Sequence, residues 1–164
     1  MKNARKFDER ITIGGVPNSE DLEQLKDLGY KTLIDLRDEE EKFGGYVERK
    51  AISLGLKYVN IPIRREEITI EDITRFYYAV YEKGSAPLYC FSRFGKKPLA
   101  FLLLFEAVAK EQPLYIVYRK ASGFALDLQG DLTLQAFLVN FYNSGTIESI
   151  VKTMRELRPD LFSK

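Results

Sequence analysis

The residues best suited to chemistry stand together between Pro87 and Pro98, a stretch that holds the single cysteine of the chain, Cys90. An apolar run ends near the cysteine, a short polar loop follows, and the pair Lys96-Lys97 precedes a very apolar segment. If that segment is a helix, the N–H groups of the loop and the positive end of the helix dipole can bind an oxyanion such as phosphate. The same field would favour the nucleophilic thiolate form of Cys90. The stretch therefore predicts phosphoryl transfer to sulfur.

Composition excludes several other chemistries. With no histidine and one cysteine among 164 residues, Ser-His-Asp and Cys-His catalysis, an internal disulfide and a zinc site of the usual nitrogen and sulfur ligands are ruled out. A formal net charge of +1 indicates no general attraction to nucleic acid or to an anionic membrane. No apolar run has the length of a signal peptide or a membrane span, so we expect a cytoplasmic protein. We also expect no metal and no organic cofactor, while the oligomeric state stays open.

The elements that must position these residues can be predicted from apolar periodicity. Length and a 45% apolar content suit a single domain over residues 1–164. Strands are expected at Ile11–Gly15, Lys31–Arg37, Leu56–Pro62 and Ala86–Phe91. Helices are expected after Asn18 through Leu28, over about Glu40–Leu54, from Thr69 to Tyr81, and over Leu99–Ala109, Asp131–Tyr142 and Thr146–Leu157. The alternation predicts an α/β fold with a central, mostly parallel, four- or five-stranded sheet flanked by helices.

In this order of elements the sequence resembles the cysteine-dependent phosphatases of the tyrosine and dual-specificity type, and most of all their small bacterial branch. The resemblance rests on Gly15–Leu22, on Asp35-Leu36-Arg37, on Gly55–Pro62 and on the helix start Ile68–Asp72. It runs in order over residues 10–110, while the C-terminal third fits only as helices. It implies a dual-specificity-phosphatase-like fold and hydrolysis of a phosphomonoester, such as a phosphotyrosine, a phosphoserine or a phosphorylated metabolite, through a cysteinyl-phosphate intermediate.

The resemblance also implies a set of site residues. Cys90 matches the nucleophile of the family signature, which reads His-Cys, five residues, arginine and a hydroxyl residue. Phosphate would be bound by the loop that follows, namely by Phe91, Ser92, Arg93, Phe94, Gly95, Lys96 and Lys97. Relatives place an aspartate that protonates the leaving oxygen in the loop after the third predicted strand. Here Glu66 or Glu67 could take that part, and Arg64 and Arg65 could instead face the phosphate.

The signature loop departs from the family pattern. Tyr89 replaces the histidine, Arg93 stands in place of a glycine, Lys96 in place of the arginine and Lys97 in place of the hydroxyl residue. Arginine offers a planar fork to two phosphate oxygens, whereas lysine offers a flexible point charge, so the loop suits anion binding better than turnover.

Two other functions therefore stay open beside the hydrolase. One is a catalytically impaired pseudophosphatase that binds a phosphorylated ligand or partner. The other is a sulfur carrier of rhodanese type, whose loop is normally one residue shorter.

Charged residues near the second predicted strand have simpler interpretations. Asp35 and Arg37 are expected to play structural roles at the strand end. The acidic run Asp38–Glu41 is expected to be a solvated helix start, where negative side chains are favoured by the dipole.

Overall fold

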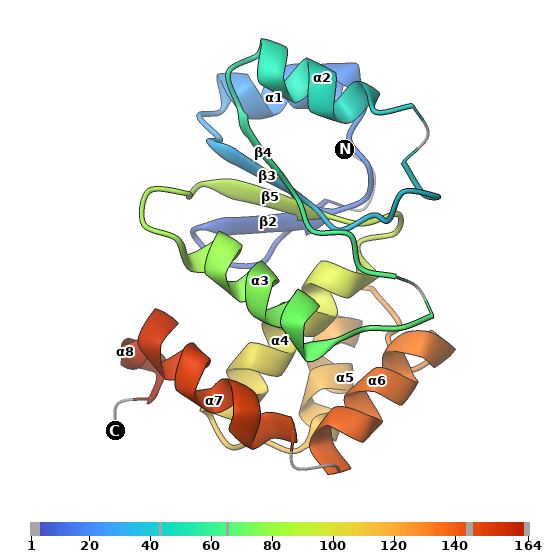
Figure 1. Ribbon diagram of the computed structural model, residues 1–164, viewed down its shortest axis with the longest axis vertical. Helices are drawn as coiled ribbons and strands as arrows, with labels where there is room; N and C mark the ends of the chain where they lie inside the picture. Colours follow the sequence, from blue (N-terminus) through green and yellow to red (C-terminus); the bar gives the residue numbers. More distant parts are fainter. Residues whose placement is uncertain (1–3, 43, 65, 144–145, 163–164) are drawn as a thin grey trace.

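A five-stranded sheet of order β1-β2-β5-β3-β4 lies at the centre of the computed structural model, which describes residues 4–42, 44–64, 66–143 and 146–162 (Figure 1). Neighbouring strands β2, β5, β3 and β4 run parallel, and the edge strand β1 pairs with β2 in the antiparallel sense. The strands are β1 (Arg5–Lys6), β2 (Ile11–Gly14), β3 (Thr32–Asp35), β4 (Lys57–Asn60) and β5 (Leu88–Phe91). The predicted α/β class and mostly parallel sheet are confirmed. The two-residue β1 has no periodic pattern by which the sequence could reveal it.

Helices cover both faces of the sheet, which explains why β2, β3 and β5 are buried along their whole length. Helices α1 (Ser19–Asp27) and α2 (Tyr46–Ser53) pack on one face, and α3 (Ile70–Tyr81) and α4 (Lys96–Ala109) pack on the other (Figure 1). The successive side chains of β5 therefore point alternately into two separate apolar cores. Tyr89 and Phe91 belong to the core under α1 and α2, and Leu88 and Cys90 belong to the core on the α3 and α4 side.

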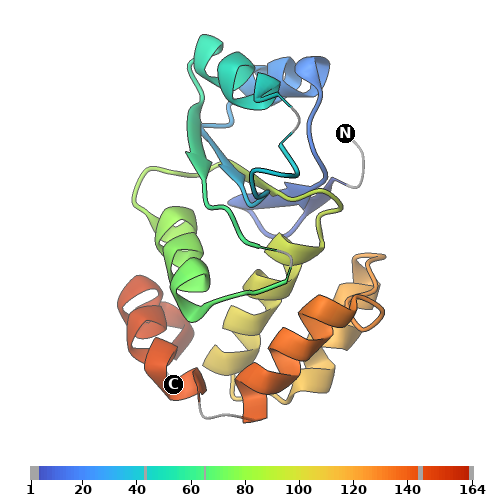
Figure 2. The ribbon, with the colours of Figure 1, turned by 45° about the vertical axis from the view of Figure 1, so that its right-hand side comes forward.

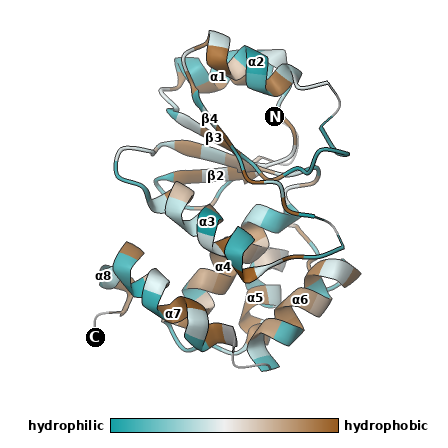
Figure 3. Ribbon diagram, viewed as in Figure 1, coloured by the Kyte–Doolittle hydropathy of each residue, from teal (hydrophilic) through white to brown (hydrophobic). Residues whose placement is uncertain are grey.

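The C-terminal helices complete the second core by packing around α4. They are α5 (Leu114–Gly123), α6 (Leu132–Asn143), α7 (Thr146–Leu157) and α8 (Pro159–Phe162). Because α4 lies between the sheet and these helices, it is apolar nearly all round, as its colouring in Figure 3 shows. Pro98 lies in the first turn of α4, where its missing N–H leaves no bond unmade. Within the described residues, no helix is both long enough and apolar enough to span a bilayer.

One predicted helix begins later than expected. The sequence predicts a helix over Glu40–Leu54, but α2 starts at Tyr46, after two glycines that both have positive φ. The acidic run Asp38–Glu41 forms a turn instead of a helix start. In this turn the backbone N–H of Asp38 donates to Glu41 Oε1 at 3.2 Å, and the N–H of Glu41 donates to Asp38 Oδ1 at 3.0 Å. The carboxylates thus satisfy local backbone donors and hold the turn in place.

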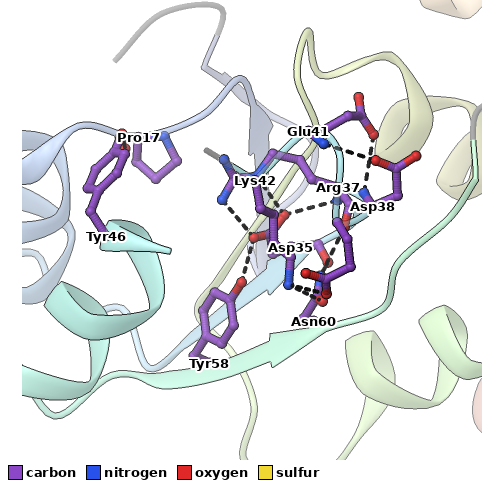
Figure 4. A network of polar contacts seen from close by, with 10 residues as sticks. Pro17, Asp35, Arg37, Asp38, Glu41, Lys42, Tyr46, Tyr58 and Asn60 are labelled. Atoms are coloured by element: carbon purple, nitrogen blue, oxygen red, sulfur yellow. Dashed lines mark hydrogen bonds and ion pairs between the residues drawn. The ribbon is translucent and has the colours of Figure 1, made fainter. Parts of the chain in front are cut away.

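A buried carboxylate network fixes the carboxyl ends of β3 and β4 (Figure 4). Asp35 accepts hydrogen bonds from the backbone N–H, Nε and the NH2 nitrogen of Arg37, at 2.9–3.0 Å, and from the hydroxyl of Tyr58 at 2.6 Å. The side-chain amide of Asn60 donates to the backbone carbonyls of Asp35 and Arg37. Burial and the bond to Asp35 raise the pKa of Tyr58, so the phenol stays a donor. The strand ends from which the functional loops leave are therefore rigidly joined.

The network predicts a measurable loss of stability when its phenol is removed. Tyr58→Phe deletes a hydrogen bond to a charged acceptor and should lower the free energy of unfolding by about 1.5–3 kcal/mol. Urea unfolding followed by circular dichroism measures the change. Tyr78→Phe, at a half-exposed position of α3, is the matched control and should shift stability by less than about 0.5 kcal/mol. Equal stability of the two variants would contradict this account of Asp35.

Candidate anion-binding site

The loop between β5 and α4, residues 92–95, leaves the sheet at the carboxyl ends of its parallel strands, where α/β proteins bind ligands. Gly95 ends the loop with φ of +81°, a conformation that other residues rarely adopt. A Cβ on Gly95 would lie 3.1 Å from the backbone carbonyl of Gly14, at the end of β2. Two glycines thus let the loop cross the end of the neighbouring strand and enter α4 directly.

Ser92 lies at the base of this loop, as the first residue after β5. Its side chain is nearly buried, and its hydroxyl oxygen accepts a hydrogen bond from the backbone N–H of Gly95 at 3.1 Å. Ser92 also lines the cavity that opens above the loop. A loop amide that points at the side-chain atom of the first loop residue is the arrangement that would favour a nucleophilic anion at that position.

Cys90 lies inside β5, two positions before the loop, and this corrects the expectation that it lies at the loop base. It pairs in register with Ile13 of β2 and Ile34 of β3, and its side chain is fully buried in the apolar core. Burial raises the pKa of the Cys90 thiol well above its usual value. This direction is opposite to the one expected from the sequence, because the thiol is fully buried in the apolar core, where the charged thiolate loses its hydration.

Lys97 is the basic residue that the fold holds most firmly at the site. Its ammonium donates to the backbone carbonyl of Ile63 at 2.9 Å and lies 3.5 Å from Glu41 Oε1. The side chains of Lys97 and Glu41 are only 11% and 15% exposed. Lys96, which the sequence places at the clamping position, is half-buried at the start of α4. If Ser92 takes the place of the nucleophile at the loop base, Lys97 takes the place of the clamping cation that the sequence assigned to Lys96.

A cavity of about 390 Å³ opens above the loop and collects residues from four segments of the chain. Its lining includes the cations Arg93, Lys96 and Lys97, which outnumber the acids Glu41 and Asp131. The full lining is Glu41, Ile68, Ser92, Arg93, Phe94, Lys96, Lys97, Gly130, Asp131, Leu132, Thr133 and Leu134. The first turns of α4 and α6 lie on the same side of the helical layer (Figure 2), and both supply lining residues. The positive ends of both helix dipoles therefore lie at this cavity.

The predicted acids of the loop after β4 are not brought to the cavity. Glu66 and Glu67 are exposed and lie outside its lining, as does the exposed Arg64. Arg65 lies outside the described residues. Of the other predicted site residues, Phe91 is buried under α1 and α2, whereas Ser92, Arg93, Phe94, Lys96 and Lys97 line the cavity and Gly95 supplies the loop N–H.

Two acidic residues at the cavity, Glu41 and Asp131, are missing from the sequence prediction. Asp131 precedes α6, and its Oδ1 accepts the backbone N–H of Leu134 at 3.1 Å, as expected of a residue that caps a helix. That local pattern is visible in the sequence, but the meeting of Asp131 with the loop after β5 is not. Among the described residues, no cluster of three histidine, cysteine, aspartate or glutamate side chains could hold a metal ion.

The sheet order, the glycine-ended loop after β5 and the buried helix behind it define a protein of the tyrosine and dual-specificity phosphatase class. More narrowly, the chain belongs to the family described as DSP-PTPase phosphatase fused to NAD+ kinase, whose sequence profile matches residues 2–98.

Two curated proteins are similar in sequence to this chain, and solved structures are similar to it in fold. The chain is 31% identical over 112 residues, or 66% of its length, to a beta-lactamase hydrolase-like protein of Agrobacterium fabrum. It is 35% identical over 86 residues, or 50% of its length, to a probable NAD kinase 2 of Oryza sativa. It spans only 26% and 9% of these two proteins. The core catalytic domain of the PP-IP phosphatase SIW14 from S. cerevisiae superposes with a TM-score of 0.72 at 16% identity, covering 99% of this chain and 95% of that one.

The position of the thiol predicts its reactivity. In the native protein Cys90 should react with iodoacetamide at neutral pH only as fast as the protein unfolds, because the sulfur is buried and its pKa is raised. The matched variant carries Cys90→Ala together with Ser92→Cys, which moves the thiol to the loop base. It should be alkylated at least about tenfold faster, as a thiol beside loop amides and a helix N-terminus has a lowered pKa. Rapid alkylation of native Cys90 would contradict the burial.

Proposed function

We propose that this protein is a pseudophosphatase, which binds a phosphorylated ligand at the loop after β5 without hydrolysing it. One observation supports this most: the loop base holds the hydroxyl of Ser92, and the sole thiol, Cys90, is buried behind it. Phosphate transfer in this class needs a thiolate, which forms near neutral pH and leaves readily. A serine hydroxyl does not ionise at that pH, and no histidine exists in the chain to take its proton.

The features that bind an anion are retained. The loop still turns through a glycine into a helix of 14 residues, and Gly95 still directs its N–H into the loop. Lys97 keeps a positive charge beside the cavity through its contacts with Ile63 and Glu41. The related SIW14 domain was solved in complex with citrate, an anion, in keeping with an anion site on this fold. The loop glycine, the helix start and a positive charge are thus kept, while lysine replaces the fork of the family arginine.

The hydrolase hypothesis has less support. It requires the sulfur of Cys90 to reach phosphate, and it requires Glu66 or Glu67 to reach the leaving oxygen, yet these residues lie outside the cavity lining. The sulfur carrier needs an accessible thiol in the same way. A single domain over residues 1–164, a cytoplasmic location and the absence of nucleic-acid or membrane partners remain predictions.

Binding without turnover predicts that the affinity for phosphate depends on the lysines of the cavity. Inorganic phosphate or vanadate should raise the melting temperature, and Lys96→Ala should weaken phosphate binding about three- to tenfold because it removes a half-buried cation from the cavity. Isothermal titration calorimetry measures the dissociation constants. Lys110→Ala, at the exposed far end of α4, is the control and should leave them unchanged. If phosphate binds neither the wild type nor the control, the proposed function fails.

The identity of residue 92 predicts which variant gains activity. Wild-type protein should not hydrolyse p-nitrophenyl phosphate, whereas Ser92→Cys should gain measurable turnover because a thiolate then lies beside the loop N–H groups. Adding Lys97→Arg should increase the rate further, since the planar guanidinium of arginine can bind two phosphate oxygens at once, whereas the ammonium of lysine is a single point charge. Release of p-nitrophenol under single-turnover conditions is the measurement. Wild-type hydrolysis that Cys90→Ser abolishes would overturn the proposal and restore Cys90 as the nucleophile.

A further inference from the structure

Two large apolar side chains stand exposed at the mouth of the anion-binding cavity. Phe94, in the loop after β5, is 54% exposed, and Leu132, the first residue of α6, is 76% exposed. Both line the same cavity although they are far apart in the sequence. Neither belongs to either apolar core of the molecule. Exposed apolar side chains gathered around a concave site commonly mark a binding surface.

The polarity of the cavity changes between its base and its mouth. At the base lie Ser92, Lys96 and Lys97, and at the mouth lie Phe94 and Leu132. The volume of about 390 Å³ falls in the range of small-molecule sites and exceeds the needs of a single phosphate group. The space above the base must therefore accept the organic part of the ligand.

Two charged side chains of the lining, Asp131 and Arg93, already make contacts within the protein. Asp131 Oδ1 accepts the N–H of Leu134, and the guanidinium of Arg93 lies over the ring of Phe94, 5.0 Å from its centroid. Where a sugar or polyol lies against Phe94 and Leu132, its hydroxyl groups would lose water without gaining a hydrogen bond from these side chains, which is unfavourable. An aromatic or alkyl group would lose only apolar contact with water, which is favourable.

We propose that Phe94 and Leu132 are specificity residues that select phosphate esters with an apolar organic group over sugar and polyol phosphates. The inference rests on the proposed function, since the phosphate of the ester occupies the loop after β5. It adds the chemical class of the ligand, which the loop alone does not define. The two side chains come from different segments, the loop after β5 and the start of α6, so each can be tested separately.

A competition among esters of equal charge tests the selection. Phenyl phosphate and hexyl phosphate should bind at least about tenfold more tightly than glycerol phosphate and ribose 5-phosphate, as expected when a ring or short chain is partly buried. Calorimetry at constant ionic strength gives the four dissociation constants. Inorganic phosphate serves as the reference for the base of the site. Vesicles with and without phosphatidic acid then distinguish a lipid ester from a soluble one. Binding only to the vesicles that contain phosphatidic acid assigns the ester to a bilayer. Binding to neither kind of vesicle assigns it to solution.

Surface variants separate this inference from the proposed function. Leu132→Ser should reduce the preference for phenyl phosphate about threefold or more and leave the affinity for inorganic phosphate unchanged. Phe94→Ser should reduce that preference by a similar factor when each ester is compared with inorganic phosphate in the same variant, because the ring also carries the guanidinium of Arg93. Leu28→Ser, which removes a leucine 63% exposed at the end of α1, is the control and should change neither. Melting temperatures verify that the variants fold. If inorganic phosphate binds but the esters bind equally well, this inference is overturned while the proposed function stands; if phosphate itself does not bind, both fail.

Discussion

The chemistry of this protein depends on where strand β5 ends. Every side chain of β5 is buried, because parallel neighbours lie at both edges and helices cover both faces. Cys90 and Ser92 are two positions apart, but β5 ends at Phe91 between them. The sulfur therefore belongs to the core, whereas the hydroxyl belongs to the loop. A displacement of two positions along one strand decides whether the loop presents a thiolate or an alcohol to a bound anion.

The remaining site residues are held by contacts between segments that are distant in sequence. Lys97 at the start of α4 bonds to Ile63 after β4 and pairs with Glu41 after β3. Asp38 closes the turn that carries Glu41, and this turn follows the joined strand ends at Asp35 and Asn60. Removing either charge of the Lys97–Glu41 pair would leave its partner mostly buried and unpaired, which is costly. The pair therefore orders two loops at the same time as it keeps a cation at the cavity.

The sequence predicts the scaffold well because its signals are local. Apolar β-branched runs reveal β2, β3, β4 and β5, and Thr69 with Asp72 forms the expected capping box at the start of α3. The site is harder to predict because it depends on register and on tertiary contacts. Because the chain has one cysteine and it stands near a glycine loop, the family signature is matched to Cys90. Only the burial of Cys90 and the end of β5 at Phe91 show that the loop begins at Ser92. Nothing local indicates that Glu41, Asp131 and Leu132 converge on that loop.

Gly95 passes close to Gly14, and this contact makes the path of the loop independent of the reactivity of residue 92. The path of the main chain is dictated by positions that carry no side chain, while reactivity is dictated by the single atom that residue 92 presents. We therefore expect a substitution at residue 92 to change the chemistry of the loop without changing its path past Gly14.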